Sequence, residues 1–263
     1  MSTSPKPPFR ADQVGSLIRP ERLIAAREKV KAGDMAPADL TSIEDECIRE
    51  AVKLQEEAGL LSITDGEFRR RVWYADFLSG FDNVREAGMM LDVAVNGADG
   101  SVTHSKLQGM VVEGKITRST PIQVPSYEFL KPLTKRTIKV CIPSPSMMHF
   151  RGGREAIDRK AYPDMAMFWA DLTAAYRVEI EDLISRGLTY LQFDDTNLAY
   201  LCDDNFRAAV AKLGEDPNAL PLKYCSVIND AVRGLRDKAT FTIHLCRGNA
   251  RQGGVAAGGV ARG

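Results

Sequence analysis

The stretch TFTIHLCRGN, residues 240–249, alternates apolar and polar side chains over most of its length. Successive side chains in a β-strand point to opposite faces, so the pattern predicts a strand in which His244 and Cys246 share one face. Their Cα atoms are then roughly 6–7 Å apart. An imidazole nitrogen and a thiolate at this spacing are suited to zinc. The alternative is a core histidine beside a small buried cysteine.

Other segments of strand length end in polar residues or in a proline turn. Residues 60–67, 137–142 and 188–193 are apolar runs of this kind, and a short strand is predicted over 11–17. Helical segments separate these strands, which predicts an α/β fold with parallel strands. Because polar residues gather at the strand ends, we expect a (β/α)8 barrel of the TIM type. With the strand at 240–246 the barrel is incomplete, since about five of eight strands are found.

An open doubly wound sheet is the alternative architecture. Its nucleotide-binding forms carry G-x-G-x-x-G or G-x-x-x-x-G-K-[ST] after a strand, and neither pattern follows a predicted strand here. Residues 90–118 interrupt the order of helices and strands with short valine-rich segments around glycines. This composition predicts an inserted β-hairpin.

Helices are predicted from caps and from apolar residues at helical spacing. The capping-box pattern at residues 41–44 predicts a helix that ends at Gly59. Asp164 is the predicted N-cap of a helix that ends at Gly187. Three further helices are expected at residues 20–27, 126–135 and 221–238.

Composition limits the kinds of partner. The chain has 263 residues, of which 44% are hydrophobic, and 35 Lys plus Arg balance 35 Asp plus Glu. This balance argues against nucleic acid or a membrane surface and favours an enzyme acting on small molecules. Five cysteines without a C-x-x-C pair, together with no apolar leader, predict a cytoplasmic protein. We expect residues 1–9 to be a flexible tail and the Gly/Ala-rich residues 250–263 to lie outside the domain.

Four motifs in order resemble the catalytic barrel of the cobalamin-independent methionine synthase family, in particular its short single-barrel relatives. They are VGS at 14–16, TDGEFRR at 64–70, QFDD at 192–195 and HLC at 244–246. The resemblance covers residues 10–249. It implies a methyltransferase of methionine biosynthesis that transfers a methyl group to the thiol of homocysteine.

The resemblance also implies a zinc ion that binds the homocysteine sulfur as a thiolate. His244 and Cys246 are then two of its ligands, and no residue is assigned as a general acid or base. The family completes the zinc site with a glutamate and a second cysteine beyond this strand, whereas residues 250–263 contain no Glu, Cys or His. The expectation is therefore a truncated barrel that binds zinc weakly.

By the same resemblance, Glu67 and Asp194 hold the amino group of homocysteine, while Gly15 and Ser16 receive its carboxylate. Two carboxylates satisfy an ammonium through charge-assisted hydrogen bonds. Seen alone, these residues also suit a helix-capping acid, a strand-end turn and an ordinary Gly-Ser turn. Two other functions stay open: zinc-dependent alkyl transfer to another thiol, and an inactive barrel fragment.

The methyl donor is left open by the sequence. In folate-using synthases the segment that resembles residues 143–149 carries a pterin-stacking tryptophan, and here His149 stands near that place. A methylated folate is the expected donor if the resemblance holds there. The arginines at 69–71 are suited to an anionic donor tail, and the alternative is a solvated helix start.

Overall fold

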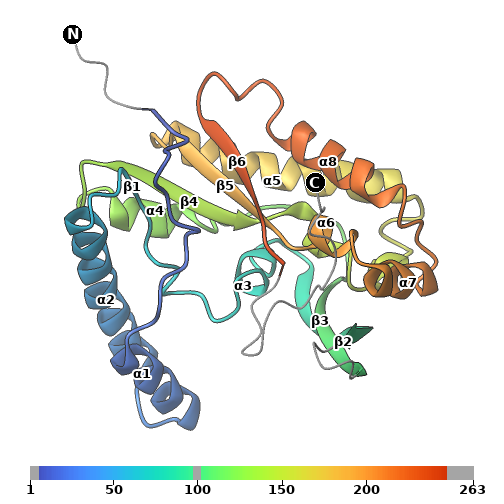
Figure 1. The fold of residues 1–263 in the computed structure, drawn as a ribbon, viewed down its shortest axis with the longest axis horizontal. Coiled ribbons are helices and arrows are strands. Elements are labelled where there is room, and N and C mark those ends of the chain that lie inside the picture. The colour runs from blue at the N-terminus through green and yellow to red at the C-terminus, as the bar shows by residue number, and fades with distance from the viewer. Residues whose placement is uncertain (1–5, 97–101, 248–263) are drawn as a thin grey trace.

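The computed structural model describes residues 6–96 and 102–247, which form an α/β fold (Figure 1). In chain order its elements are α1 (Glu21–Ala32), α2 (Pro37–Glu57), β1 (Ser62–Ile63), α3 (Ala75–Leu78), β2 (Val84–Asn96), β3 (Val102–Val112), α4 (Val124–Leu130), β4 (Thr137–Pro143), η1 (Pro145–Met148), η2 (Gly153–Ala156), α5 (Met165–Ser185), β5 (Tyr190–Asp195), α6 (Asn197–Tyr200), α7 (Asp204–Lys212), α8 (Leu220–Ala231) and β6 (Thr240–Leu245). The centre is a parallel sheet in the order β1-β4-β5-β6. In Figure 1, α5 and α8 lie along one side of this sheet, and α2 lies beside β1.

One face of the sheet is apolar and the other is polar, because residue type alternates along each strand. Ile142, Leu191 and Phe193 belong to the main hydrophobic core, to which α5 also contributes. On the opposite face, the strand register aligns three rows of side chains: Lys139–Tyr190–Thr240, Cys141–Gln192–Thr242 and Pro143–Asp194–His244. Inward-facing rows of this kind are typical of the interior of a TIM barrel.

The N-terminal segment at residues 11–17 lies against the polar face of the sheet, but it is not the strand that the sequence predicted. Side chains from the sheet bind it instead. The Tyr190 hydroxyl donates to the Asp12 carboxylate at 2.6 Å, and the Gln192 amide donates to the Val14 carbonyl at 2.8 Å. The segment is therefore fixed by hydrogen bonds to side chains, which no strand pattern reveals.

Several element boundaries differ from the prediction: α1 continues to Ala32, α4 ends at Leu130, and β1 is reduced to Ser62–Ile63. Helix α2 begins at Pro37, four residues before the expected capping residue Thr41. The Thr41 hydroxyl donates to the Pro37 carbonyl at 3.2 Å, inside the helix. Proline suits the first turn, since its missing N–H needs no partner there. Helix α8 ends at Ala231, seven residues earlier than predicted.

The predicted cap of α5 and the inserted hairpin are confirmed. The Asp164 side chain accepts a hydrogen bond from the Ala166 N–H at 2.9 Å and caps α5. The inserted hairpin is present as the antiparallel pair β2 and β3, although it begins at Val84 and not at residue 90. Its buried side chains Leu91 and Val93 pack in a second core with α7.

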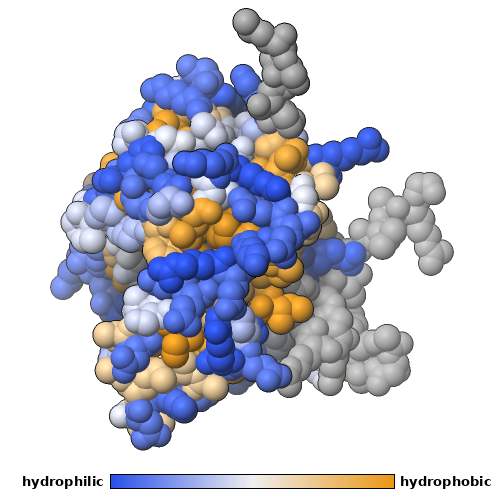
Figure 2. Space-filling view, turned by 90° about the vertical axis from the view of Figure 1, so that its left-hand side faces the viewer, coloured by the Kyte–Doolittle hydropathy of each residue, from blue (hydrophilic) through white to orange (hydrophobic). Residues whose placement is uncertain are grey.

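Figure 2 views the side of the molecule that lies at the left of Figure 1. Hydrophilic side chains cover much of this face, and apolar side chains form separate areas among them. Within residues 6–96 and 102–247, no helix combines the length and apolar character needed to cross a membrane.

The cap of α7 gives a first testable prediction. The Asp203 carboxylate accepts hydrogen bonds from the Asn205 and Phe206 N–H groups at 3.0 and 3.2 Å. Asp203→Ala should lower the free energy of unfolding by about 1 kcal/mol, measured by urea titration, because two helix-terminal N–H groups lose their acceptor. The control is Asp237→Ala, an exposed site, with an expected change within about 0.5 kcal/mol. Equal losses in both variants would exclude a capping role.

Candidate active site

A cavity of about 470 Å³ lies at the carboxyl ends of the parallel strands. Five of the six residues singled out in the sequence line it: Ser16, Glu67, Asp194, His244 and Cys246. The sixth, Gly15, is adjacent, since a Cβ atom added to it would lie 3.0 Å from Glu67 Oε1. The structure therefore brings together residues that are up to 231 positions apart in the sequence (15 to 246).

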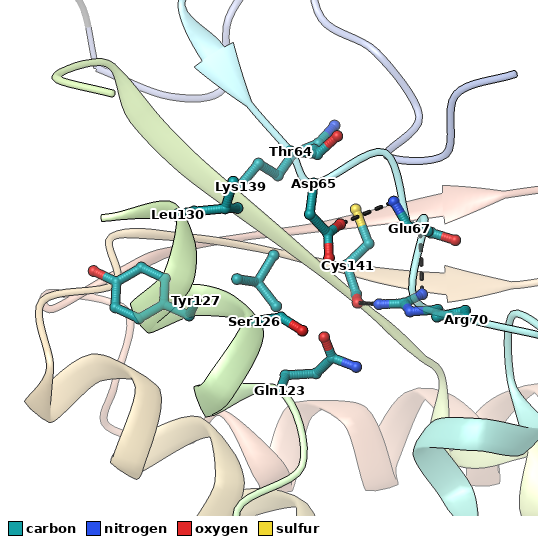
Figure 3. Close-up of a pocket in the computed structure, with 11 residues that line it drawn as sticks. Thr64, Asp65, Glu67, Arg70, Gln123, Ser126, Tyr127, Leu130, Lys139 and Cys141 are labelled. Atoms are coloured by element: carbon teal, nitrogen blue, oxygen red, sulfur yellow. Dashed lines mark hydrogen bonds and ion pairs between the residues drawn. The ribbon is translucent and has the colours of Figure 1, made fainter. Parts of the chain in front are cut away.

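Glu67 is positioned by the loop that follows β1. Its backbone has φ = 57°, a left-handed conformation that costs about 1–3 kcal/mol for a residue other than glycine. The loop holds this conformation because the Asp65 carboxylate accepts a hydrogen bond from the Glu67 N–H at 2.9 Å. Arg19 also donates to the Arg70 carbonyl at 2.9 Å. Figure 3 shows how the loop brings Asp65, Glu67 and Arg70 against β4 at Cys141.

The Glu67 carboxyl is buried beside one cation and one anion. Arg70 Nη1 lies 3.2 Å from Glu67 Oε1, and both side chains are almost fully buried. Burial raises the pKa of Glu67 to about 7, against a smaller lowering by Arg70 and a further increase from the nearby Asp194 carboxylate. Glu67 therefore ionises near neutral pH, where the arrival of a cation would favour its charged form.

Cys141 is a residue of the site that was not predicted from the sequence. Its sulfur and the carboxylate oxygens of Glu67 and Asp194 lie within 4.8 Å of one another, and these three side chains could hold a metal ion. Burial and the two carboxylates raise the pKa of the Cys141 thiol well above its usual value. One feature of the sequence does point to Cys141: it lies two positions after Lys139 on β4, and this spacing places both side chains on the polar face of the sheet.

His244 and Cys246 both line the cavity, as expected for side chains two positions apart on a strand. His244 is paired with Asp194 across β5 and β6, and its Nδ1 lies 3.4 Å from Asp194 Oδ1. The Cys246 N–H donates to the Asp195 carbonyl at 2.8 Å, which continues the pairing of the two strands by one bond. The imidazole thus lies beside the carboxylate that also faces Glu67 and Cys141.

His149 lies outside this cavity. It is 1% exposed, with Nδ1 3.0 Å from the Tyr224 hydroxyl and Nε2 3.2 Å from the Glu215 carboxylate. Burial among aromatic rings gives it a structural position between η1, α5 and α8. Arg151, two residues later, lines the cavity instead.

The three consecutive arginines at 69–71 have three different environments. Arg69 forms ion pairs with Asp45 at 2.5 Å and with Glu44 at 3.6 Å, away from the cavity. Arg70 pairs with Glu67 as described above. Only Arg71 combines a place in the cavity lining with an exposed side chain. The run therefore does not act as one basic patch.

Comparison with known proteins agrees with this geometry. Residues 9–247 match the family described as cobalamin-independent synthase, catalytic domain. The chain is 38% identical over 255 residues to the uncharacterised protein YxjH of Bacillus subtilis, covering 97% of this chain and 66% of that protein. It therefore spans just under two thirds of the length of this relative. A 5-methyltetrahydropteroyltriglutamate–homocysteine methyltransferase of Thermosynechococcus vestitus is 26% identical over 73% of this chain and 24% of its own.

Solved structures give the same result. A putative vitamin-B12 independent methionine synthase from Listeria monocytogenes superposes with a TM-score of 0.75 at 34% identity, covering 93% of this chain and 67% of that one. A B12-independent methionine synthase from Shewanella in complex with selenomethionine shares the fold, with a TM-score of 0.60 at 18% identity over 83% of this chain and 56% of that one. These matches confirm an α/β fold of the TIM-barrel type, of which the described residues form part. The chain belongs to the cobalamin-independent methionine synthase family.

Proposed function

We propose that this chain carries the catalytic domain of a zinc-dependent methyltransferase that methylates the thiol of homocysteine and forms methionine. The observation that carries the proposal is the grouping of Glu67, Asp194, His244 and Cys246 around one cavity. Carboxylates on one side and nitrogen and sulfur donors on the other fit a substrate that has both an ammonium and a thiol. Five cysteines without a C-x-x-C pair fit a reducing compartment, so we place the activity in the cytoplasm.

Glu67 and Asp194 are proposed to hold the amino group of homocysteine. Their oxygens lie within 4.8 Å, which allows one ammonium to contact both through charge-assisted hydrogen bonds. A cation between two neighbouring carboxylates also relieves their repulsion. Gly15 and Ser16 are proposed to receive the substrate carboxylate, because Ser16 lines the cavity and Gly15 adjoins Glu67.

His244 and Cys246 are proposed as zinc ligands. An imidazole nitrogen and a thiolate are donors that zinc prefers, and the strand directs both side chains to the cavity. The Asp194 carboxylate, 3.4 Å from His244 Nδ1, can orient the imidazole as a hydrogen-bond acceptor. A zinc ion held by His244 and Cys246 would lower the pKa of a coordinated thiol, so that the nucleophilic thiolate would persist near neutral pH.

Methionine formation tests the proposal. The full chain, supplied with zinc, is incubated with homocysteine and 5-methyltetrahydropteroyltriglutamate, the donor named for the Thermosynechococcus relative. We expect methionine, detected by mass spectrometry, and no methylation of the comparison thiol 2-mercaptoethanesulfonate, which has no amino group. Preference for the sulfonate thiol would support alkyl transfer to another thiol. No methylated thiol in either reaction would contradict the proposed activity of this chain.

Removal of the sulfur donor is expected to weaken zinc binding. Cys246→Ala should lower the zinc affinity about tenfold, or by about 1.4 kcal/mol, because a thiolate ligand is lost. Competition with a chromophoric chelator measures this change. The matched control is Cys225→Ala, which removes an exposed thiol of α8 outside the cavity and should leave the affinity unchanged. A similar loss in both variants, or in neither, would remove Cys246 from the ligand set.

A further inference from the structure

Arg151 brings a buried positive charge to the cavity that the proposed function leaves unused. It follows η1 at the end of β4, lines the cavity and is only 7% exposed. Nη1 donates to the Gln108 carbonyl at 2.7 Å, and the guanidinium lies 4.6 Å from the centre of the Tyr74 ring. Nε is buried without a hydrogen-bond partner.

Within the part of the chain that the structure describes, no carboxylate lies within 4.0 Å of the Arg151 guanidinium. Its neighbours are a carbonyl and aromatic rings, which stabilise a cation less than an anion does. Burial accordingly lowers the pKa of Arg151, with Tyr74 and Tyr200 as the nearest groups that oppose the change. Because Arg151 is charged, buried and without a nearby carboxylate, an anion that enters the cavity would stabilise its charge.

A second arginine of the cavity lining, Arg19, has a similar environment. Arg19 also lines the cavity; among the described residues it donates to the Glu67 and Arg70 carbonyls alone, and its buried Nε has no partner there. In contrast, Arg71 lies in the lining with its charge already paired to Glu86 and Asp76. Unpaired positive charge is therefore concentrated at Arg151 and Arg19.

Arg151, Tyr200 and Cys246 line the same cavity. Burial raises the pKa of the Tyr200 hydroxyl, the positive charge of Arg151 opposes this rise, and Cys246 adds to it, so Tyr200 is near enough to both residues to feel their charges. Tyr200 and Trp73 supply aromatic surface in the same cavity. A ligand that fills this cavity contacts Arg151 and Tyr200 as well as Cys246.

We propose that Arg151 binds an oxyanion group, a carboxylate, sulfonate or phosphate, of the second substrate that donates the methyl group. This inference rests on the proposed function for the identity of that substrate as a methyl donor. The planar guanidinium suits the two oxygens of such a group, and Arg151 Nε has no protein acceptor. Arg151 thus determines specificity for an anionic donor.

Binding of small anions to the full chain tests the proposal. The probes are methyl phosphate and methanesulfonate, titrated by calorimetry into the wild-type chain, Arg151→Gln, Arg151→Lys and the control Arg71→Gln. We expect saturable binding to wild type, at least tenfold weaker binding to Arg151→Gln, and a change of less than twofold in Arg71→Gln. Arg151→Lys keeps the charge but cannot form the bidentate hydrogen bonds of a guanidinium, so methyl phosphate should bind about three- to tenfold more weakly.

The outcomes separate this proposal from the proposed function. Unchanged anion binding in Arg151→Gln, or no saturable binding to wild type, overturns the anion site. If Arg151→Gln does not fold, the Arg151→Lys titration decides, and unchanged methyl phosphate affinity there overturns it. Weaker homocysteine binding in Arg151→Gln would overturn the assignment to a second substrate. A wild-type chain that binds methyl phosphate through Arg151 but no homocysteine would confirm the anion site and contradict the proposed function.

Discussion

Replacing Glu67 by Gln should remove a pH-dependent loss of stability worth about 3 kcal/mol between pH 4.5 and 7. The folded-state pKa of Glu67 is about 7, and its ordinary value is 4.5. Between these values the folded chain keeps a proton that the unfolded chain has released, so stability falls as the pH rises. At 1.36 kcal/mol per pH unit, this interval corresponds to about 3 kcal/mol.

Urea unfolding of wild type and Glu67→Gln at pH 5, 6, 7 and 8 isolates the contribution of Glu67 ionisation to the free energy of unfolding. The ion pair with Arg70 forms only as Glu67 ionises, so its effect is already contained in the folded-state pKa of about 7. We expect the variant to gain about 2.5 kcal/mol relative to wild type between pH 5 and pH 8, because part of the full change lies below pH 5. The control Glu57→Gln, at the exposed end of α2, should show a constant difference. A constant difference for Glu67→Gln as well would show that burial does not govern its ionisation.

Asp194→Asn should weaken homocysteine binding about ten- to a hundredfold, or by about 1.5–3 kcal/mol. The substitution keeps the shape of the side chain and removes the charge that the ammonium is proposed to contact. Zinc content should stay the same, because the proposed ligands His244 and Cys246 are unchanged and the Asn oxygen still accepts a hydrogen bond from His244 Nδ1. Calorimetric titration with homocysteine and elemental analysis measure the two effects. Asp204→Asn, an exposed change of the same charge, is the control. Loss of zinc with unchanged homocysteine affinity would make Asp194 a metal or structural residue.

Much of the sheet could be predicted from the sequence, because alternation along a strand is a local property. The strands at β4, β5 and β6 and the shared face of His244 and Cys246 followed from it. The start of α2 was missed because two local signals compete there, and the Pro37 first turn prevailed over the capping box at residues 41–44.

The residues that make up the site were harder to predict from the sequence. Cys141 joins Glu67 and Asp194 only through the register of β4 against β5, and the sequence contains no direct record of register. His149 was expected near the donor site, but Arg151 lines the cavity in its place. The cause is similar, since it lies in local backbone geometry. Residues 145–148 form a short 3-10 helix, which turns His149 into the core and leaves Arg151 at the cavity.

The proposed function depends on recognition of the amino group of the thiol substrate by Glu67 and Asp194. Its most direct test is a pair of titrations, of homocysteine and of 4-mercaptobutanoate, which lacks only the amino group, into wild type and Asp194→Asn. We predict that wild type prefers homocysteine by about ten- to a hundredfold, and that Asp194→Asn loses most of this preference while binding 4-mercaptobutanoate unchanged. Equal affinity of wild type for both thiols, or an equal loss of both in Asp194→Asn, would contradict this recognition.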